Sequence, residues 1–463
     1  MNSLWDAVAP AGAVAIPQFH GRGGSVSLTD LASGSFFNGK LSQLRARSVL
    51  ISTAEQLATA VALFELDGLA RRMVLCTPDL KDEQIAAVAA AAQADAIVTD
   101  TEPAGRKLAA ASYLMTQQPQ IANLGERRDV ETEWILLTSG TTGTPKLVVH
   151  TLQSLGGTLP RPAAAKLRTV WSTFYDIRRY GGLQIYLRAV LGGSPLVLSS
   201  ADESTDEFLT RAASAGVTHI SGTPSHWRKA LMSGAAARLT PEYVRLSGEV
   251  ADQPLLDALR VAYPGATIAH AFASTEAGVA FDVTDGLAGF PAQFIENRRD
   301  GIELKVEAGT LHIRSGRNAV RYLGEAPGVL AGGDGFVDTG DMVELVAGRY
   351  YFRGRRGGVI NVGGLKVYPE EVESVLNADP RVRMSLVRAR RSPITGAIVV
   401  ADIVLADCAP ASPATRASWE TTVKSELQNA CRRALAPHKV PAILRVVPTL
   451  ELTAAGKLVR PNG

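Results

Sequence analysis

One segment combines residue types that suit the binding of a polyphosphate. It is the apolar run Trp134–Leu137, followed by Thr-Ser-Gly-Thr-Thr-Gly-Thr-Pro and Lys146. Glycines let backbone N–H groups approach an anion closely, hydroxyls donate further hydrogen bonds, and the lysine adds a positive charge. The segment is not a Walker loop, because Lys146 follows Pro145 instead of a glycine. We predict a phosphate-binding loop built from Thr138, Ser139, Gly140, Thr141, Thr142, Gly143 and Lys146.

This loop resembles the phosphate loop of the adenylate-forming superfamily, which holds acyl- and aryl-CoA synthetases, peptide-synthetase adenylation domains and luciferases. Further stretches match that family's motifs in the right order, so the resemblance covers about Val26 to Arg460. Phe272-Ala-Ser-Thr-Glu276 (with Ala273, Ser274 and Thr275) is similar to the motif whose aromatic ring stacks on adenine, whose threonine contacts the α-phosphate and whose glutamate holds Mg²⁺. Asp341 ends a segment similar to the ribose-binding Thr-Gly-Asp motif.

The carboxy-terminal part of the chain carries the rest of the resemblance. It implies that Arg355 binds ribose, that Gly357 is a hinge, and that a loop with Gly363 and Gly364 lines a thiol-entry channel. It also implies that Lys457, in a Gly-Lys motif, bridges the substrate carboxylate and the α-phosphate.

Four positions depart from the family pattern. Ala273 replaces a usual glycine, Asn361 a frequent lysine, Gly357 a usual Asp or Lys, and Leu147 a frequent glycine after the loop lysine. None of these changes removes a charged group that the chemistry requires.

The resemblance implies a reaction in two halves. A carboxylate attacks the α-phosphorus of ATP and pyrophosphate leaves, with Lys457, Thr275, Glu276 and Mg²⁺ stabilising the charge that develops. The small carboxy-terminal domain then rotates, and a thiol attacks the mixed anhydride. Free CoA or a separate carrier protein is the expected acceptor, and an amine acceptor stays open. A non-catalytic nucleotide-binding scaffold is the alternative of another class.

The acid itself is predicted only as a class. The corresponding pocket lacks a histidine found in many members and has aromatic residues instead, which favours an aryl or short-to-medium acyl acid. Ser247-Gly248-Glu249 resembles the adenine-side loop of the small-acid and aryl-acid branches. The expected pocket residues are Phe174, Tyr175, Tyr180, Gly181, Gly222 and Gly278.

The elements that position these residues alternate between short apolar strands and longer helical patterns, which predicts an α/β fold. Expected strands include Arg72–Cys76 and Ala96–Thr99. We expect a large N-terminal domain, residues 1–356, of helix-covered sheets with a small antiparallel β region. A small mobile α+β domain, residues 357–463, with a helix over Ser418–Leu435, is expected to follow it.

Composition excludes several classes of protein. The chain has 463 residues, 46% of them hydrophobic, and a formal charge of +3, so it is neither disordered nor generally attracted to nucleic acid or anionic lipid. Cys76, Cys408 and Cys431 form no C-x-x-C pair, so neither a zinc site nor a disulfide framework is indicated. The amino end shows no signal peptide and no run is long enough to span a membrane, so we expect a cytoplasmic enzyme.

Overall fold

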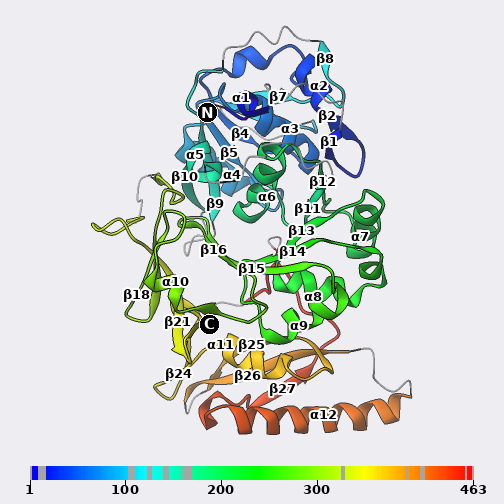
Figure 1. Cartoon of the computed structure of the whole chain (residues 1–463), viewed down its shortest axis with the longest axis vertical. Helices are drawn as coiled ribbons and strands as arrows, with labels where there is room; N and C mark the ends of the chain where they lie inside the picture. Colours follow the sequence, from blue (N-terminus) through cyan, green and yellow to red (C-terminus); the bar gives the residue numbers. More distant parts are fainter. Residues whose placement is uncertain are drawn as a thin grey trace.

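The structure, a computed structural model, describes residues 3–8, 17–102, 110–121, 128–138, 145–157, 159, 169–324, 329–392, 395–406, 412–453 and 456–460. Two large sheets form its amino-terminal part, a five-stranded antiparallel sheet lies beside them, and a small α/β unit closes the other end (Figure 1). Of the helices in the described ranges, none has the length and apolar character that crossing a bilayer requires.

The first large sheet has seven strands, and its central strands are parallel because helices connect them. Helices α3 (Gln56–Leu66) and α4 (Asp82–Ala92) are two of these connections. In spatial order the strands are β20 (Arg321–Leu323), β10 (Lys146–His150), β9 (Glu133–Thr138), β5 (Arg72–Leu75), β4 (Ser48–Ile51), β6 (Ala96–Thr99) and β7 (Ala111–Leu114).

The second large sheet has eight strands, and the carboxyl ends of its parallel strands point to one edge. Its order is β16 (Gly278–Val283), β15 (Thr267–Ser274), β14 (Tyr243–Ser247), β13 (His219–Gly222), β11 (Trp171–Thr173), β12 (Leu196–Leu198), β1 (Pro17–His20) and β2 (Ser25–Ser27). Its helices are α6 (Tyr180–Leu191), α7 (Thr205–Ser214), α8 (Pro224–Met232) and α9 (Gln253–Ala262). Ligands of open α/β sheets bind at this edge.

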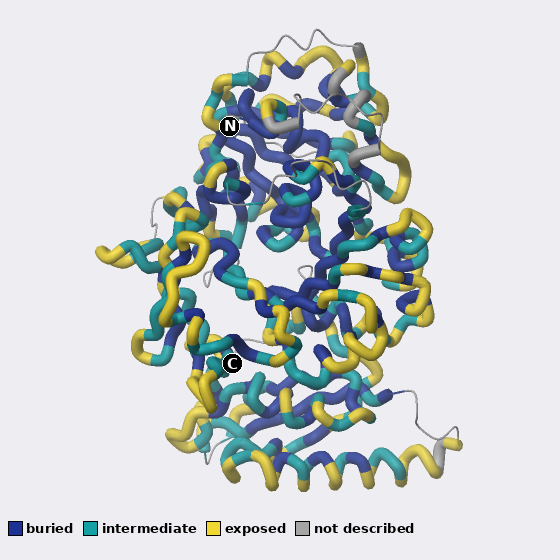
Figure 2. The backbone as a smooth tube through the Cα atoms, viewed as in Figure 1, coloured by how far each residue is buried: buried dark blue, intermediate teal, exposed yellow. Residues whose placement is uncertain are grey.

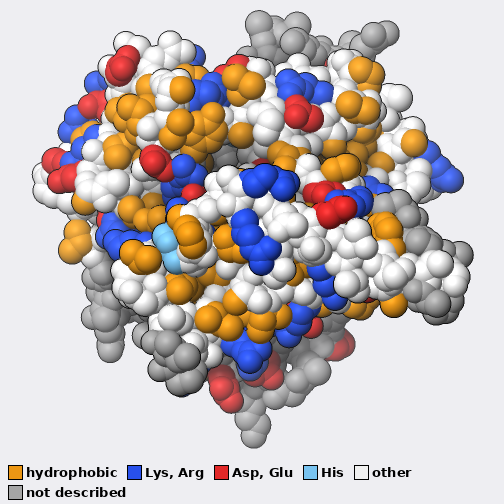
Figure 3. Space-filling model, turned by 90° about the horizontal axis from the view of Figure 1, so that it is seen from below, with side chains coloured by type: hydrophobic (Ala, Val, Ile, Leu, Met, Phe, Trp, Pro, Cys, Tyr) orange, Lys and Arg blue, Asp and Glu red, His pale blue; other side chains and the backbone are white. Residues whose placement is uncertain are grey.

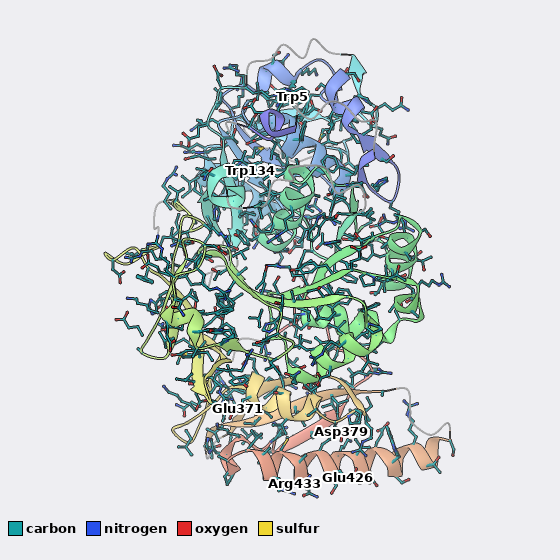
Figure 4. The ribbon with its side chains drawn as sticks, in the orientation of Figure 1. Trp5, Trp134, Glu371, Asp379, Glu426 and Arg433 are labelled. Carbon is teal, nitrogen blue, oxygen red and sulfur yellow. The ribbon has the colours of Figure 1, made fainter. Side chains whose placement is uncertain are left out.

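A large hydrophobic core joins the two sheets. Figure 2 shows the backbone of this region as mostly buried, and side chains from both sheets contribute, such as Trp134 of β9 and Tyr186 of α6. The indole of Trp134, labelled in Figure 4, donates to Asp67 at 3.0 Å. Short elements complete this part: α1 (Leu4–Val8), α2 (Leu28–Ser33), β3 (Gly34–Ser35), η2 (Leu41–Leu44), β8 (Gln120–Ile121), α5 (Leu152–Gly156), η3 (Gly234–Arg238) and α10 (Gln293–Glu296).

The five-stranded sheet is the small antiparallel β region that the sequence predicted for the amino-terminal domain. Its strands are β17 (Phe290–Pro291), β22 (Arg349–Arg355), β21 (Val337–Val346), β19 (Thr310–Arg314) and β18 (Glu303–Glu307). Ala347 and Gly348 join β21 to β22 with φ of 46° and 81°. Positive φ at both central residues is what a tight two-residue hairpin requires.

After β22 the chain enters different sheets through a short turn, η4 (Arg356–Gly358). The remaining elements are β23 (Ile360–Val362), β24 (Leu365–Val367), α11 (Pro369–Asn377), β25 (Val382–Ser392), β26 (Gly396–Leu405), α12 (Pro413–Ala434), η5 (Pro437–Lys439) and β27 (Ile443–Val446). Helix α12 begins five residues before the predicted Ser418, because Pro413 occupies a first-turn position where proline is tolerated.

The carboxy-terminal unit has its own core and polar surface. Val372 and Leu376 of α11 pack with Leu427 and Cys431 of α12. Arg381 donates to Asp379 and to Glu426 of α12, two acidic residues labelled in Figure 4. On the end that this unit presents, hydrophobic, basic and acidic side chains are interspersed (Figure 3).

Candidate active site

The adenylate-side motifs meet at the carboxyl edge of the eight-stranded sheet. Ser247 and Ser274 end the neighbouring parallel strands β14 and β15, whose register pairs Ser247 with Ala271. Thr275 and Glu276 form the turn into β16, and His150 of β10 bonds the Thr275 carbonyl at 2.7 Å. Burial lowers the pKa of His150 to about 4, so the imidazole that fixes this turn is neutral.

The predicted phosphate loop is a connection between antiparallel strands. Thr138 and Lys146 are register partners at the facing ends of β9 and β10. Ser139, Gly140, Thr141, Thr142 and Gly143 lie outside the described residues. The ammonium of Lys146 lies 5.4 Å from the ring centre of Tyr322, and burial together with the neighbouring Glu276 raises the pKa of the Tyr322 hydroxyl. The base of the loop and the proposed magnesium ligand therefore share one neighbour.

The aromatic residue of the adenine motif lies in an aromatic group. Phe272 stacks on Phe352 with ring centres 5.0 Å apart and an interplanar angle of 8°. It also stacks on Phe281 at 5.9 Å. Ala273 is partly buried and packs against the main core.

The two proposed ribose ligands lie side by side. Asp341 of β21 and Arg355 of β22 are register partners, and the Arg355 Nε donates to Asp341 at 3.2 Å. Burial raises the pKa of Asp341, and Arg355 and Lys457 act in the opposite direction.

Lys457 reaches this pair from the far end of the chain. A methyl group on Gly248 would lie 3.2 Å from its Cε. Desolvation and the positive charge of Arg355 lower the pKa of Lys457, whereas Glu249 and Asp341 raise it. The structure thus brings Lys457, Asp341, Arg355 and Gly248 together.

The loop that carries Lys457 is seated on the amino-terminal part by three contacts. The hydroxyl of Thr223, the N-cap of α8, donates to the Gly456 carbonyl at 2.6 Å. The Leu458 N–H donates to Glu249 Oε1 at 3.0 Å, while Glu249 Oε2 accepts from the Ser225 N–H at 2.9 Å. Both oxygens of the Glu249 carboxylate therefore bind backbone, a role that the resemblance to an adenine-side loop does not include.

The third contact explains why residue 456 is a glycine. Gly456 has a φ of 69°, and a Cβ there would lie 1.8 Å from the Cε1 of His226. The ring of His226 is stacked on Phe174 at 5.3 Å and interacts with Thr223 at its Nδ1. Burial lowers the pKa of His226 to about 4. A neutral imidazole is thus the surface on which the loop rests.

Tyr175 is a buried residue of the predicted acid pocket. Its hydroxyl is buried and bonds the Ser247 carbonyl at 2.7 Å and the Ser247 hydroxyl at 2.9 Å. A Cβ on Gly181 would meet the Tyr175 ring at 3.4 Å, and one on Gly222 would meet Phe174 at 2.7 Å. Tyr180 is buried and opens α6. Gly278, with a φ of 73°, lies against Arg317.

A cleft of about 510 Å³ opens beside Glu276 and Arg355. Its lining includes Ser274, Glu276, Tyr322, Thr339 and Arg355. The proposed magnesium ligand, Glu276, and one of the two proposed ribose ligands, Arg355, therefore border one open space.

The chain matches two family models. The model described as AMP-binding enzyme matches residues 49–301, and the model described as AMP-binding enzyme C-terminal domain matches residues 371–457. The chain belongs to the AMP-binding enzyme family.

Proteins named as CoA ligases are among the relatives of this AMP-binding enzyme. A 2-succinylbenzoate–CoA ligase from Geobacillus kaustophilus is 29% identical over 71% of this chain and 68% of its own. A second such ligase, from Bacillus velezensis, is 27% identical over 90% of this chain and 82% of its own. The anthranilate CoA ligase AuaEII in complex with anthranoyl-AMP shares the fold, with a TM-score of 0.77 and 17% identity over 98% of this chain and 95% of that one.

These matches confirm the resemblance, the α/β fold class and the expected enzyme class, an AMP-forming acid–thiol ligase. They also support ATP and CoA as its substrates.

The two thiol-channel glycines lie in the β23–β24 hairpin, where the Gly363 N–H donates to the Thr395 carbonyl and the Gly364 N–H to the Asn361 side chain. Gly357 lies in η4, where a Cβ would meet no atom within 4 Å.

Sequence reasoning missed His226 and the helix-capping role of Thr223. The signal that could have found them is Thr-Pro-Ser-His at residues 223–226, in which Thr223 caps the helix and His226 occupies the third position of a capping box.

Proposed function

We propose that this AMP-binding enzyme activates an aryl acid with ATP and transfers the acyl group to the thiol of CoA. The observation that carries the proposal is the convergence of Lys457, Asp341 and Arg355 at the strand edge that also presents Thr275. A cation delivered from the carboxy-terminal unit suits the step in which charge develops at the α-phosphate.

In the first half-reaction, a carboxylate oxygen forms a bond to the α-phosphorus and the bond to the bridging oxygen of the β-phosphate breaks. Lys457 would bridge the carboxylate and the α-phosphate, and Thr275 would donate to the same phosphate. Asp341 and Arg355 would hold the ribose, and Phe272 with the 247–249 loop would border the adenine. In the second half-reaction the thiol sulfur bonds to the acyl carbon and AMP leaves.

Mg²⁺ is proposed at Glu276. Among the described residues, no group of three or more His, Cys, Asp or Glu could hold a metal ion by itself. Mg²⁺ is commonly held by one or two carboxylates together with substrate phosphates, so a single glutamate at an open cleft fits that mode. The ion would neutralise charge on the phosphates.

The hinge and the thiol channel belong to the same proposal. We place the boundary between the two domains at residues 356 and 357, where the five-stranded sheet ends, with Gly357 as the joint. Rotation about it would withdraw Lys457 and bring the hairpin with Gly363 and Gly364 to the acyl-adenylate.

The acid class rests on the aromatic pocket and on the relatives. Phe174, Tyr175 and Tyr180 are the aromatic residues proposed for this pocket, and the relatives named above are ligases of aryl acids by their names. A carrier-protein thiol or an amine stays the alternative acceptor.

The test has two parts. Pyrophosphate exchange into ATP, measured over a panel of aryl and short-to-medium acyl acids, should identify acids that depend on Lys457. Thioester formation with CoA should then be measured for those acids. Pyrophosphate exchange without formation of a CoA thioester would indicate that the acceptor is a carrier protein or an amine. Absence of exchange with every acid, in a protein that binds ATP, would favour a nucleotide-binding scaffold.

A further inference from the structure

A nearly buried ion pair lies where the amino-terminal part meets the carboxy-terminal unit. Helix α8 packs against β25, and the start of α9 lies beside the end of α11 (Figure 1). Arg228 of α8 donates through Nη2 to the carboxylate of Asp252 and through Nη1 to the Arg383 carbonyl of β25 at 3.4 Å. The exposed fractions of the Arg228 and Asp252 side chains are 13% and 11%, so water is largely excluded from the pair.

The two oxygens of Asp252 make different contacts. Oδ1 accepts from the Leu255 N–H at 3.1 Å, which caps α9. Oδ2 accepts from Arg228 and also from the side-chain amide of Asn377, the last residue of α11, at 3.2 Å. The amide oxygen of Asn377 accepts from the Ser385 hydroxyl of β25 at 2.8 Å, which fixes the asparagine within its own unit. One carboxylate oxygen therefore joins the two parts of the chain.

The bond to Asn377 bears on the position of Lys457 through α11. Asn377 and Glu373 are four residues apart, so they lie on the same side of the helix, one turn from each other. Glu373 binds Arg460, which follows Lys457 by three residues. Holding α11 at Asn377 therefore restricts the movement of the loop that carries Lys457.

These contacts between the two parts exist only in the orientation that the structure shows. Arg228 and Asp252 both belong to the amino-terminal part, whereas Asn377 and the Arg383 carbonyl belong to the carboxy-terminal unit, which moves in the proposed rotation. Each contact includes a charged side chain, and hydrogen bonds of charged groups are stronger than those between neutral groups. Their loss would therefore shift the balance between the two orientations.

We propose that Arg228, Asp252 and Asn377 form a latch that holds the carboxy-terminal unit in the orientation of the first half-reaction. They are positioning residues, because they act on Lys457 through α11 and the pair of Arg460 with Glu373. The latch opens in the rotation that admits the thiol. This inference rests on the proposed activation of an acid in two half-reactions.

The experiment exchanges the donor and the acceptor of the latch. Asp252→Asn keeps an oxygen that can cap α9, but its amide then faces the amide of Asn377, so two donors meet. Asn377→Asp places a carboxylate against the carboxylate of Asp252, so two acceptors meet. In the double variant the amide at position 252 donates to the carboxylate at position 377, and Arg228 again has an anionic partner.

Each single variant should lower the rate of pyrophosphate exchange about tenfold, while thioester formation from supplied acyl-adenylate stays at the wild-type rate or rises. The double variant should recover exchange to within about threefold of the wild type, because the two substitutions compensate each other. Asp257→Asn is the matched control. Asp257 pairs with Arg260 on α9, within the amino-terminal part, so its loss should alter neither half-reaction.

Losses that add up in the double variant, or that are equal in the two half-reactions, would overturn the latch. Single variants without any loss would overturn it as well. If Asp252→Asn or Asn377→Asp does not fold, Asn377→Ala carries the test, because it removes the bond between the two parts without adding a charge. Exchange alone should then fall.

Tryptic cleavage after Arg355 and Arg356 gives a readout that needs no substrate. Both side chains are exposed and precede the proposed joint at Gly357. The single variants should be cleaved faster than the wild type, and the double variant at the wild-type rate, because a released unit exposes the joint. Equal cleavage rates in all four proteins would overturn the latch. Absence of exchange with every acid in the wild type would instead defeat the proposed function, and the cleavage rates would still decide whether the latch exists.

Discussion

Arg460 donates two hydrogen bonds to Glu373, at 2.9 Å to Oε1 and 2.7 Å to Oε2. Arg460 follows Lys457 by three residues, and Glu373 is a buried residue of α11 whose Oε1 also accepts from the Val387 N–H at 2.7 Å. The bidentate pair fixes the lysine loop to the carboxy-terminal unit. The contacts of Thr223 and Glu249 with the same loop tie it to the amino-terminal part. In the proposed rotation, the first attachment would persist and the second would release.

Arg460→Met should therefore weaken the carboxy-terminal unit and the first half-reaction together. The substitution leaves the Glu373 carboxylate buried without its cation. Removing one partner of a buried pair is costly, and because Arg460 is partly exposed we expect a loss on the order of 2 kcal/mol in the free energy of unfolding. Pyrophosphate exchange should fall about tenfold, since the loop is less well positioned. Chemical denaturation measures the free energy of unfolding, and the kinetics of pyrophosphate exchange measure the first half-reaction.

The control for this anchor is Arg416→Met, which removes an exposed arginine paired with Glu420 on α12. It should change neither quantity appreciably. Unchanged stability and exchange in Arg460→Met would contradict the anchor.

Lys457→Ala should separate the two half-reactions. Adenylate formation should fall by about a hundredfold or more, as for the loss of a group that stabilises developing charge. Thioester formation from a supplied acyl-adenylate should stay near the wild-type rate, because the lysine is proposed to act only in the first step. Equal losses in both reactions would argue for a structural role of Lys457.

Thr223→Val tests the contact that holds the Lys457 loop against the amino-terminal part of the protein. It removes the hydroxyl that donates to Gly456 and caps α8, whereas Thr223→Ser keeps both interactions. We expect Thr223→Val to reduce pyrophosphate exchange several-fold more than thioester formation from supplied adenylate, with Thr223→Ser close to wild type.

A capping control is available in the neighbouring helix. Ser204 caps α7 by accepting from the Glu207 N–H at 3.2 Å, so Ser204→Ala loses a cap of the same kind without altering the lysine loop. Both cap variants should lose about 1 kcal/mol of stability. If Ser204→Ala and Thr223→Val affect the two half-reactions alike, the Thr223 hydroxyl does not position the loop that carries Lys457.

Glu276→Gln should raise the magnesium concentration needed for half-maximal activity by about tenfold or more, because hard cations prefer charged oxygen ligands. Activity titrated against Mg²⁺ is the measurement, and thermal unfolding without metal should change little. An unchanged magnesium dependence would show that Glu276 is not a ligand of the metal.

The sequence predicted those parts of the fold and of the candidate site that depend on residues close together along the chain. Strand β6 was predicted at Ala96–Thr99 as observed, because a run of apolar and β-branched residues is a local feature of the sequence. The motif residues Asp341, Arg355 and Lys457 were predicted by resemblance, and the fold brings them together.

Other features depend on side chains that are far apart in the sequence and meet only in the folded protein. Arg188, Arg245 and Arg317 come from separate elements, and nothing in their neighbourhoods along the chain indicates that they share Asp282. Arg460 and Glu373 are 87 residues apart, and nothing in the sequence around either residue indicates that they pair. Electrostatic neighbours of this kind are set by tertiary packing, which propensity and spacing do not encode.

The last prediction concerns pH and a carboxyl far from the active site. Glu65 is buried beneath the first sheet, where Oε2 accepts from the Ser35 hydroxyl at 2.6 Å and Oε1 from the Phe36 N–H at 2.9 Å. Burial raises its pKa to about 7 from an ordinary value of 4.5. A raised pKa in the folded state means that the folded protein holds this proton more tightly than the unfolded chain. Stability is therefore greatest below about pH 4.5 as far as this group is concerned, and is lost as the pH rises to about 7.

Glu65→Gln should remove that loss, because its oxygen can accept from the Phe36 N–H and its amide can donate to the Ser35 hydroxyl. At pH 8 the variant should be more stable than the wild type by on the order of 2 to 3 kcal/mol, and the difference should shrink toward pH 5. Asp67, whose pKa burial also raises to about 7, keeps part of the pH dependence in both proteins. Denaturation midpoints of the two proteins from pH 5 to pH 8 are the measurement. A stability difference that stays constant over this range, or that grows toward acid, would show that Glu65 is ionised in the folded protein throughout.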